Sequence, residues 1–167
     1  MQDLSSLFEY GKWFCFVVGK DDLTFRARAI KKNKLFPYNK PEQTDQYYMC
    51  AMEAKSPSGE SLGNAFFDVY EGQRVYISSI FTKEEYRGLG IGSKMLGVIE
   101  FVATSFGAQY IDGRFHATTE HAKEFYEKNG FEILDEDEPS ASIKKCIDKN
   151  KSFDDITFFE REQDISL

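Results

Sequence analysis

The sequence predicts an α/β fold (an α+β mixed sheet), in which an antiparallel meander of strands precedes a β-α-β crossover. Short turns separate three strand-like segments, at 47–55, 62–70 and 75–82, and such turns join antiparallel neighbours. An amphipathic helix then begins at Ile91 and leads to a further strand at 109–115. That strand lies parallel to 75–82 if the crossover has its usual right-handed form.

The segments outside this core are expected to complete the sheet. Residues 13–18 and 25–30 predict a hairpin, and a basic, proline-containing connector follows at 31–41. A second helix, capped by Thr118 or Thr119, is expected to end at Asn129-Gly130. The closing elements that we expect are strands at 131–134 and 156–160, with a short helix inserted at 139–150.

Length and composition restrict the class of protein. The 167 residues suit one well-buried domain spanning 1–167, and a net charge of −7 repels phosphate backbones, so we expect no nucleic-acid partner. The longest apolar run near the N-terminus, 13–18, is too short for a signal or a membrane span, which predicts no membrane partner and a cytoplasmic location. The three cysteines, with only His116 and His121 beside them, have no zinc-ligand spacing.

The segment from Arg87 to Gly92, Arg-Gly-Leu-Gly-Ile-Gly, is the most informative in the chain because it joins a strand to a helix. Amide groups at a helix start favour a phosphate, and glycine lets the ligand approach them. The spacing of the glycines excludes a P-loop. Gly88-x-Gly90-x-x-Ser93 partly matches the dinucleotide-binding fingerprint, and Asp112 would be its ribose-binding acid. A glycine-rich connector without a ligand is the remaining alternative.

Two motifs resemble one known family. Arg87-x-x-Gly90-x-Gly92 is similar to the Arg/Gln-x-x-Gly-x-Gly/Ala signature of the GNAT superfamily of acyl-coenzyme A N-acyltransferases. Farther on, the run from Tyr126 to Phe131, Tyr-Glu-Lys-Asn-Gly-Phe, resembles the second signature of that family. The resemblance covers 47–134, which we take as the core, with 1–46 as an atypical N-terminal part and 135–167 as the closing part.

The resemblance implies a GNAT fold with a splayed central strand pair and acetyl-CoA as cosubstrate. In that fold the strand before the glycine loop leaves backbone groups unpaired, which here implies that Ile80 and Thr82 pair with the pantetheine arm. The cofactor-binding residues implied by the resemblance are Ile80, Phe81, Thr82, Arg87, Gly88, Leu89, Gly90, Ile91, Gly92 and Ser93, together with Thr119, which stands where the family often has Asn.

The resemblance also implies catalytic roles. Tyr126 matches the tyrosine that protonates the leaving sulfur, a role that suits a phenol with a pKa near 10. Many relatives have Glu in the strand before the glycine loop, where this chain has Ser78 and Ser79. We therefore rank His116 first as general base, because its ordinary pKa suits proton transfer; the remaining candidates are Asp68 and Glu71.

The function predicted from this resemblance is N-acetyl transfer to a primary amine by direct attack in a ternary complex. The alternatives are a noncatalytic acyl-coenzyme A binding or regulatory module and a dinucleotide oxidoreductase. We expect the partner to be a small-molecule or peptidyl amine, cationic in view of the net charge and the acidic tract 135–138. A homodimer is left open. One departure leaves the acceptor unidentified: a hairpin stands where the family usually has a strand and two helices.

Overall fold

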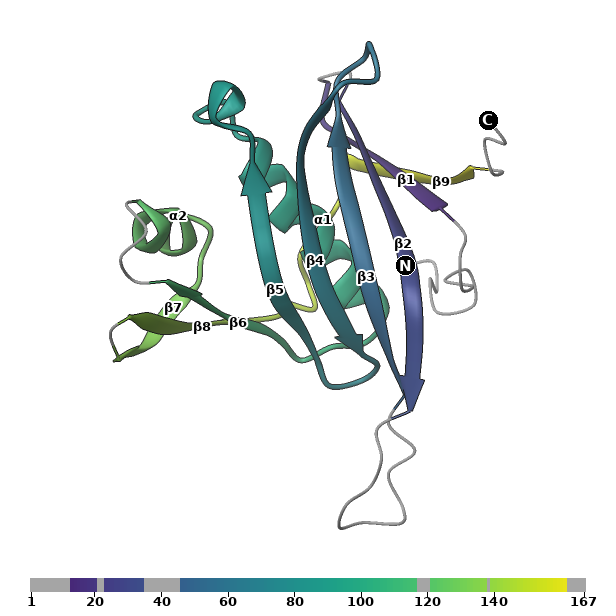
Figure 1. Ribbon diagram of the computed structural model, residues 1–167. Coiled ribbons are helices and arrows are strands. Elements are labelled where there is room, and N and C mark those ends of the chain that lie inside the picture. The colour runs from purple at the N-terminus through teal and green to yellow at the C-terminus, as the bar shows by residue number, and fades with distance from the viewer. Residues whose placement is uncertain (1–12, 21–22, 35–45, 117–120, 138, 162–167) are drawn as a thin grey trace.

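The computed structural model describes residues 13–20, 23–34, 46–116, 121–137 and 139–161 (Figure 1). Their strands form one mixed sheet in the order β7-β8-β6-β5-β4-β3-β2-β1-β9. The strands are β1 (Trp13–Val18), β2 (Thr24–Lys34), β3 (Gln46–Lys55), β4 (Ser61–Tyr70), β5 (Arg74–Thr82), β6 (Tyr110–His116), β7 (Glu132–Asp137), β8 (Ser140–Cys146) and β9 (Ile156–Arg161). The expected α/β fold with a mixed sheet is confirmed.

Consecutive strands from β1 to β5 are antiparallel neighbours, so the meander is longer than the three strands expected. The alternation of buried and more exposed residues explains why these segments form strands with one buried face. In β4, for example, the buried Ala65, Phe67 and Val69 alternate with half-exposed or exposed residues. The expected hairpin is β1 and β2, but β2 continues to Lys34, so the first part of the predicted connector is strand. The rest of that connector, 35–41, lies outside the described residues. The last strand, β9, pairs with β1 at the far edge of the sheet.

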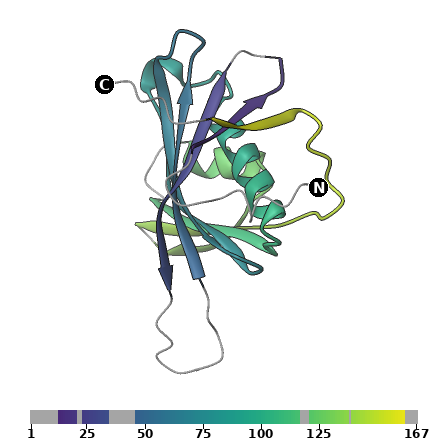
Figure 2. The same cartoon turned by 90° about the vertical axis from the view of Figure 1, so that its right-hand side faces the viewer.

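Two α-helices, α1 (Ile91–Ser105) and α2 (Ala122–Lys128), lie on the same side of the curved sheet (Figure 2). The buried stripe of α1 includes Met95, Val98, Ile99 and Val102, at helical spacing. The helix ends as predicted, since Gly107 has a φ of 68° and its N–H donates to the Thr104 carbonyl. No helix in the described part of the chain is long and apolar enough to cross a membrane.

The helix predicted at 139–150 is wrong, because Ser140–Cys146 is the strand β8. This strand lies between β6 and β7 and pairs antiparallel with both, so its backbone groups are bonded along both edges. Ala141 and Ile143 are buried with period two, whereas Lys144 lies over the Tyr110 ring. Pairing on both edges thus overrides the low strand propensity of the Ser and Lys residues.

Candidate active site

The parallel strands β5 and β6 pair over only part of their length and then diverge (Figure 1). Pairing runs from Arg74 opposite Tyr110 to Ile77 opposite Gly113. Beyond it, β5 continues to Thr82 and β6 to His116 without a register between them. One edge of β5 therefore borders a gap, which we call the β5–β6 gap.

Two local features account for the divergence. The register between β4 and β5 passes from Phe67 opposite Ile77 to Phe66 opposite Ser79, so Ser78 is the extra residue of a β-bulge. At the last paired position, a Cβ on Gly113 would lie 2.8 Å from the Ile77 carbonyl oxygen. Only glycine permits that approach without movement, and the bulge then turns β5 away from β6.

The backbone groups that face the gap follow from the antiparallel ladder on the other edge of β5. The Lys83 N–H donates to the Leu62 carbonyl at 2.9 Å, which makes this a hydrogen-bonded pair. Because such pairs alternate with non-bonded ones, Phe81 directs its backbone groups toward β4, whereas Ile80 and Thr82 direct theirs toward the gap. Two of the three expected strand residues therefore offer backbone groups there; the Phe81 side chain is 47% exposed.

The glycine loop leads from β5 into α1 through a 3₁₀ turn, η2 (Glu84–Tyr86). Gly88 and Gly90 have φ values of 78° and 79°, which other residues rarely adopt, and a Cβ on either would meet nothing within 4 Å. Gly90 is the N-cap of α1 and no side chain caps the helix. The loop therefore has open space in front of it, and Leu89 is 66% exposed.

The first turn of α1 supplies donors to that space. Lys94 begins the helical ladder by donating to the Gly90 carbonyl at 3.0 Å, so the N–H groups of Ile91, Gly92 and Ser93 have no acceptor within the helix. With the positive end of the helix dipole, they favour an anion. The structure thus assembles a cradle that would accept a diphosphate.

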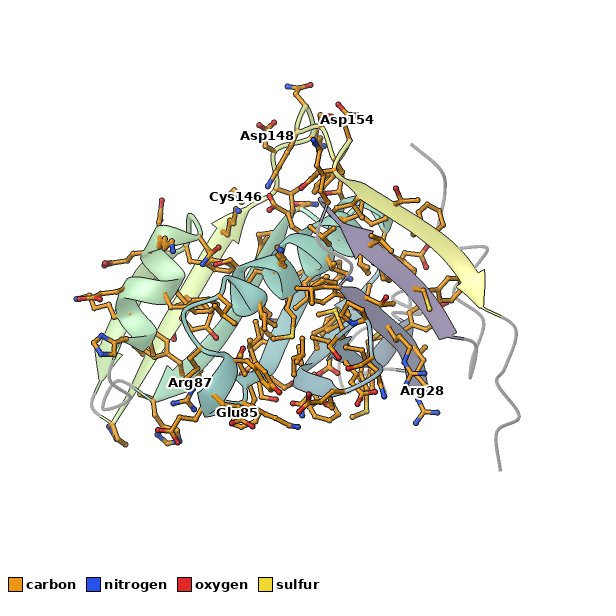
Figure 3. All side chains as sticks on the ribbon, turned by 90° about the horizontal axis from the view of Figure 1, so that it is seen from above. Arg28, Glu85, Arg87, Cys146, Asp148 and Asp154 are labelled. Carbon is orange, nitrogen blue, oxygen red and sulfur yellow. The ribbon has the colours of Figure 1, made fainter. Side chains whose placement is uncertain are left out.

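The cradle, the end of β5 and α2 are in contact with one another. A Cβ on Gly92 would lie 3.1 Å from Cε2 of Phe125 and 3.7 Å from Oγ1 of Thr82. The Arg87 Nε donates to the Thr82 carbonyl at 3.2 Å, so the exposed arginine lies across the end of β5. Figure 3 labels Arg87 beside Glu85 on this side of the molecule.

Tyr126 is buried in an aromatic cluster next to the cradle. Its ring lies 5.3 Å from that of Phe115, 5.1 Å from that of Phe125 and 5.6 Å from that of Phe131. Burial raises the pKa of Tyr126 to about 12. Among the residues that the structure describes, none bonds the Tyr126 hydroxyl, which is thus available as a donor.

His116 is the exposed last residue of β6, opposite Ser140 of β8. Successive side chains of a strand point to opposite faces. Since Phe115 packs on Tyr126, His116 lies on the face away from Tyr126. Thr119, the remaining expected contact, falls outside the described residues.

The other candidate bases lie farther down the sheet. Asp68 lies opposite Tyr76, in the closed part of the sheet, and burial raises its pKa. Glu71 follows β4 in the turn at the opposite end of β5 from Thr82, so the structure does not bring it to the gap. Ser78 and Ser79 are both exposed beside the gap.

Sequence reasoning missed two residues that shape the site. Gly113 lies inside a strand, where glycine often marks a close backbone approach, and that signal could have identified it. The extra residue at Ser78 leaves no comparable mark in the sequence. The dinucleotide-binding hypothesis is excluded because the first five strands form an antiparallel meander, whereas that fold needs parallel strands. Asp112, the expected ribose-binding acid, instead accepts a hydrogen bond from Arg74 at 2.6 Å in the closed part of the β5–β6 pair.

The domain-family model described as "Acetyltransferase (GNAT) domain" matches residues 44–133. A tyramine N-feruloyltransferase 4/11 from Nicotiana tabacum is 29% identical over 99 residues, which cover 54% of this chain and 44% of that protein. A thialysine N-epsilon-acetyltransferase from Bos taurus is 28% identical over 105 residues, covering 58% of this chain and 62% of that protein. The matches thus span less than two thirds of the length of these curated relatives.

Solved structures share the fold. A GNAT family acetyltransferase from Elizabethkingia anophelis with acetyl-CoA bound has a TM-score of 0.57 and is 15% identical, over 76% of this chain and 99% of that one. The PaiA N-acetyltransferase from Thermoplasma acidophilum, in complex with coenzyme A, has a TM-score of 0.53 and is 22% identical, over 57% of this chain and 59% of that one. At these identities the likeness concerns the fold.

Proposed function

The chain belongs to the GNAT acetyltransferase family, and from this premise we propose that it is an acyltransferase that moves acetyl from acetyl-CoA to a primary amine in a direct ternary complex. The observation that carries the proposal is the juxtaposition of two features. An unpaired edge of β5 borders the β5–β6 gap, and an uncapped helix start with open glycines lies at the end of the same strand.

The chain's own groups suit such a donor. Unpaired backbone groups cost free energy when buried, about 1–3 kcal/mol each, so the backbone groups of Ile80 and the N–H of Thr82 gain from a ligand that pairs with them as a strand would. The Thr82 carbonyl already accepts from Arg87. The amides of Gly92 and Ser93 would receive the diphosphate, in space that the positive-φ glycines leave open. The thioester of the bound cosubstrate supplies an activated acetyl group with a thiolate as leaving group.

The transfer needs a proton acceptor and a proton donor. As the amine nitrogen bonds to the carbonyl carbon and the carbon–sulfur bond breaks, His116 or a water accepts the amine proton and Tyr126 donates to the sulfur. An alkyl thiol has a pKa of about 8.5. The pKa of Tyr126 is about 12, which is higher than that of the thiol. Its hydroxyl therefore stabilises the developing thiolate mainly by donating a hydrogen bond to the sulfur. The two groups point to opposite faces of the sheet, which suits attack from one face and departure on the other.

The acceptor surface carries apolar groups on the face without helices. Phe66 and Phe81 are 44% and 47% exposed, although both are large apolar side chains. Phe81 is opposite Asn64, and Phe66 is opposite Ser79, so the two rings belong to diagonal neighbours on one face beside the gap. The relatives named for tyramine and thialysine support an amine acceptor, and this surface supports one with an apolar part.

A second function, a noncatalytic acyl-CoA binding module, is favoured by one observation. Ser78 and Ser79 stand in β5, where the family resemblance led us to look for Glu, and neither hydroxyl is a base near pH 7. Under this alternative, binding would be retained and transfer lost.

Incubation with acetyl-CoA and a panel of primary amines, followed by measurement of thiol release and of the acetylated product, tests the proposal. We expect amine-dependent thiol release that saturates in both substrates. Tight binding of acetyl-CoA in calorimetry without amine-dependent release from any member of the panel would favour the binding module. Absence of both would remove the proposal altogether.

A further inference from the structure

The mouth of the β5–β6 gap on the helix-free face of the sheet has different side chains on its two sides. On the β5 side lie the exposed rings of Phe81 and, on the neighbouring strand, Phe66. On the β6 side lie Arg114 and His116, both exposed. These two alternate along the strand with Phe115, which packs on α2 at the other face. An acceptor that enters the gap from this face therefore meets apolar rings on one side and basic groups on the other.

Arg114 lies at the closed end of the gap. It directly follows Gly113, the last residue of β6 that pairs with β5. Its Nη2 donates to Oγ of Ser140 at 2.9 Å. A hydroxyl is neutral, so this bond orients the guanidinium without compensating its charge. Of the five N–H donors of an arginine, four remain for a ligand.

The charge of Arg114 is not paired, in contrast to that of two other arginines on the same face. Arg26 pairs with Glu53 at 3.0 Å, and Arg74 pairs with Asp112 at 2.6 Å. None of the carboxylates that the structure describes forms an ion pair with Arg114. The chain has 28 acidic and 21 basic residues, so a lack of acids does not explain this. The positive charge at the mouth of the gap thus remains available to an anionic group of a ligand.

The strand beside Arg114 adds hydroxyl groups. Ser142 of β8 lies opposite Arg114 in the register, and Ser140 lies two residues before it. Both are half-buried and face the same side as Arg114, because the intervening Ala141 is buried on the other face. Asp135 of β7 is two strands away from Arg114, about 10 Å between the Cα atoms. A guanidinium next to hydroxyl donors suits a carboxylate, whose two oxygens can accept from the arginine fork and from a hydroxyl.

We propose that the acceptor is a free amino acid with an apolar side chain, whose carboxylate pairs with Arg114. Its side chain would lie on the rings of Phe81 and Phe66, and its amine would enter the gap between the two sides. The inference rests on the proposed function for the reaction. The amine is an ammonium until it loses its proton in the site, and the whole molecule carries no net negative charge.

The placement of the amine agrees with the proposed transfer. The amine nitrogen bonds to the acetyl carbon as the carbon–sulfur bond breaks, so the products are an N-acetyl amino acid and the free thiol of coenzyme A. His116 is the next residue after Arg114 on this face of β6, so the proposed proton acceptor, or a water beside it, lies near the bound amine.

The test measures kcat/KM for pairs of acceptors that differ by a carboxylate: phenylalanine with phenethylamine, and leucine with isopentylamine. Thiol release is followed at saturating acetyl-CoA and one low ionic strength, with each amino acid in its L and D forms. The wild-type chain should use the better enantiomer at least about tenfold better than the amine without a carboxylate, as one charge-assisted hydrogen bond would provide. One enantiomer should be preferred, because contacts to the side chain, carboxylate and amine fix the configuration at the α-carbon.

The carboxylate also changes the basicity of the amine, so the decisive quantity is the change in this preference between wild type and variants. Arg114→Gln should reduce the preference at least about tenfold, mainly through a higher KM for the amino acid. Arg114→Lys should recover part of it, because an ammonium keeps the charge but lacks the planar fork.

Arg28→Gln is the matched control and should keep the wild-type preference. Arg28 is an exposed arginine of β2 on the same face of the sheet, since Ala51 lies between it and Phe66 in the register. Figure 3 labels it well away from Arg87. Calorimetry with acetyl-CoA checks that each variant is folded and retains the cosubstrate site.

A best acceptor without a carboxylate would overturn the inference. So would a preference that Arg114→Gln leaves unchanged, or one that Arg28→Gln removes equally. In each case thiol release with other primary amines can continue, so the proposed function would stand. Failure of every amine and amino acid to release thiol from the wild-type chain would overturn both.

Discussion

At the scale of single residues, the environment of Tyr126 determines what its hydroxyl can do. Three aromatic rings within 6 Å exclude water from the phenol, and this burial raises its pKa to about 12. The ionised form is therefore negligible near neutral pH. A group held neutral, with a proton that no described residue accepts, is suited to donate toward a developing negative charge.

Tyr126→Phe should lower kcat by about 10-fold to 1000-fold, because it removes a proton donor and preserves the packing of the ring. The affinity for acetyl-CoA should change little. Steady-state and single-turnover kinetics with a good amine acceptor measure the effect on the chemical step. A single-turnover rate equal to that of the wild-type chain would assign Tyr126 to the core alone.

The same pKa shift predicts a loss of stability at high pH. The folded-state pKa of Tyr126 is about 12, above the unfolded value of about 10, so the contribution is complete below pH 10 and is lost as pH rises through about 12. The full effect is about 2–3 kcal/mol. Urea unfolding from pH 8 to 12 should show the Tyr126→Phe variant losing less stability than the wild-type chain. Parallel decreases in both proteins would contradict the shift.

Gly90→Glu should abolish acetyl-CoA binding in a folded protein, because a carboxylate beside the amides of the cradle repels the diphosphate. Gly59→Glu is a matched control, since Gly59 also has a positive φ, 85°, and open space around it. Both variants should lose a similar amount of stability, about 1–2 kcal/mol, from the strained backbone. Calorimetry should then show binding in the control only; equal binding in both variants would refute the cradle.

At the scale of elements, the β5–β6 gap depends on a close approach at its closed end. Gly113→Ala should destabilise the fold by about 1–3 kcal/mol, because the added Cβ would lie 2.8 Å from the Ile77 carbonyl oxygen and one strand must move. Gly97→Ala is the opposite case and should be neutral or stabilising by up to about 1 kcal/mol. Chemical denaturation distinguishes them, and two changes of the same sign and size would show that Gly113 has room.

The elements that could be predicted from the sequence are those with a clear period. The alternation in β3 to β5 and the helical stripe of α1 come from one buried face each, which a sequence displays directly. β8 could not be predicted in that way. Its two buried residues, Ala141 and Ile143, are too few to set a period, and its strand conformation comes from partners on both sides, β6 and β7.

The site likewise contains parts that a local sequence motif predicts and parts that depend on long-range pairing. The glycine loop and Tyr126 belong to local motifs, so they could be identified before the fold was known. The gap itself depends on a bulge at Ser78 and on a register with β4 and β6, which are properties of pairings between distant segments. Lys145 of β8 and Lys151 of the segment after it both bond Glu100 of α1, and only the fold brings these three residues together.

At the scale of the whole molecule, the net charge of −7 opposes the approach of an anionic cosubstrate and favours that of a cation. Figure 3 labels Asp148 and Asp154 on the opposite side of the molecule from Arg87, where the glycine loop begins. Screening limits the effect of each charge to about 10 Å, so carboxylates on that far side oppose an anion at the loop less than nearby ones would.

The acceptor is expected to be a cationic amine that loses its proton after binding, and kcat/KM for such an amine should fall as ionic strength rises. The tract 135–138 is the local source that we propose; Asp135 is exposed in β7, and the side chains of 136–138 lie outside the described residues. Asp135→Asn/Glu136→Gln/Asp137→Asn should lower kcat/KM for a polyamine at low salt. The control Asp148→Asn/Asp154→Asn/Asp155→Asn removes the same three charges elsewhere, and should have a smaller effect because screening limits each charge to about 10 Å. Equal losses in the two variants would assign the attraction to net charge alone, and a best substrate that carries net negative charge would refute the electrostatic argument.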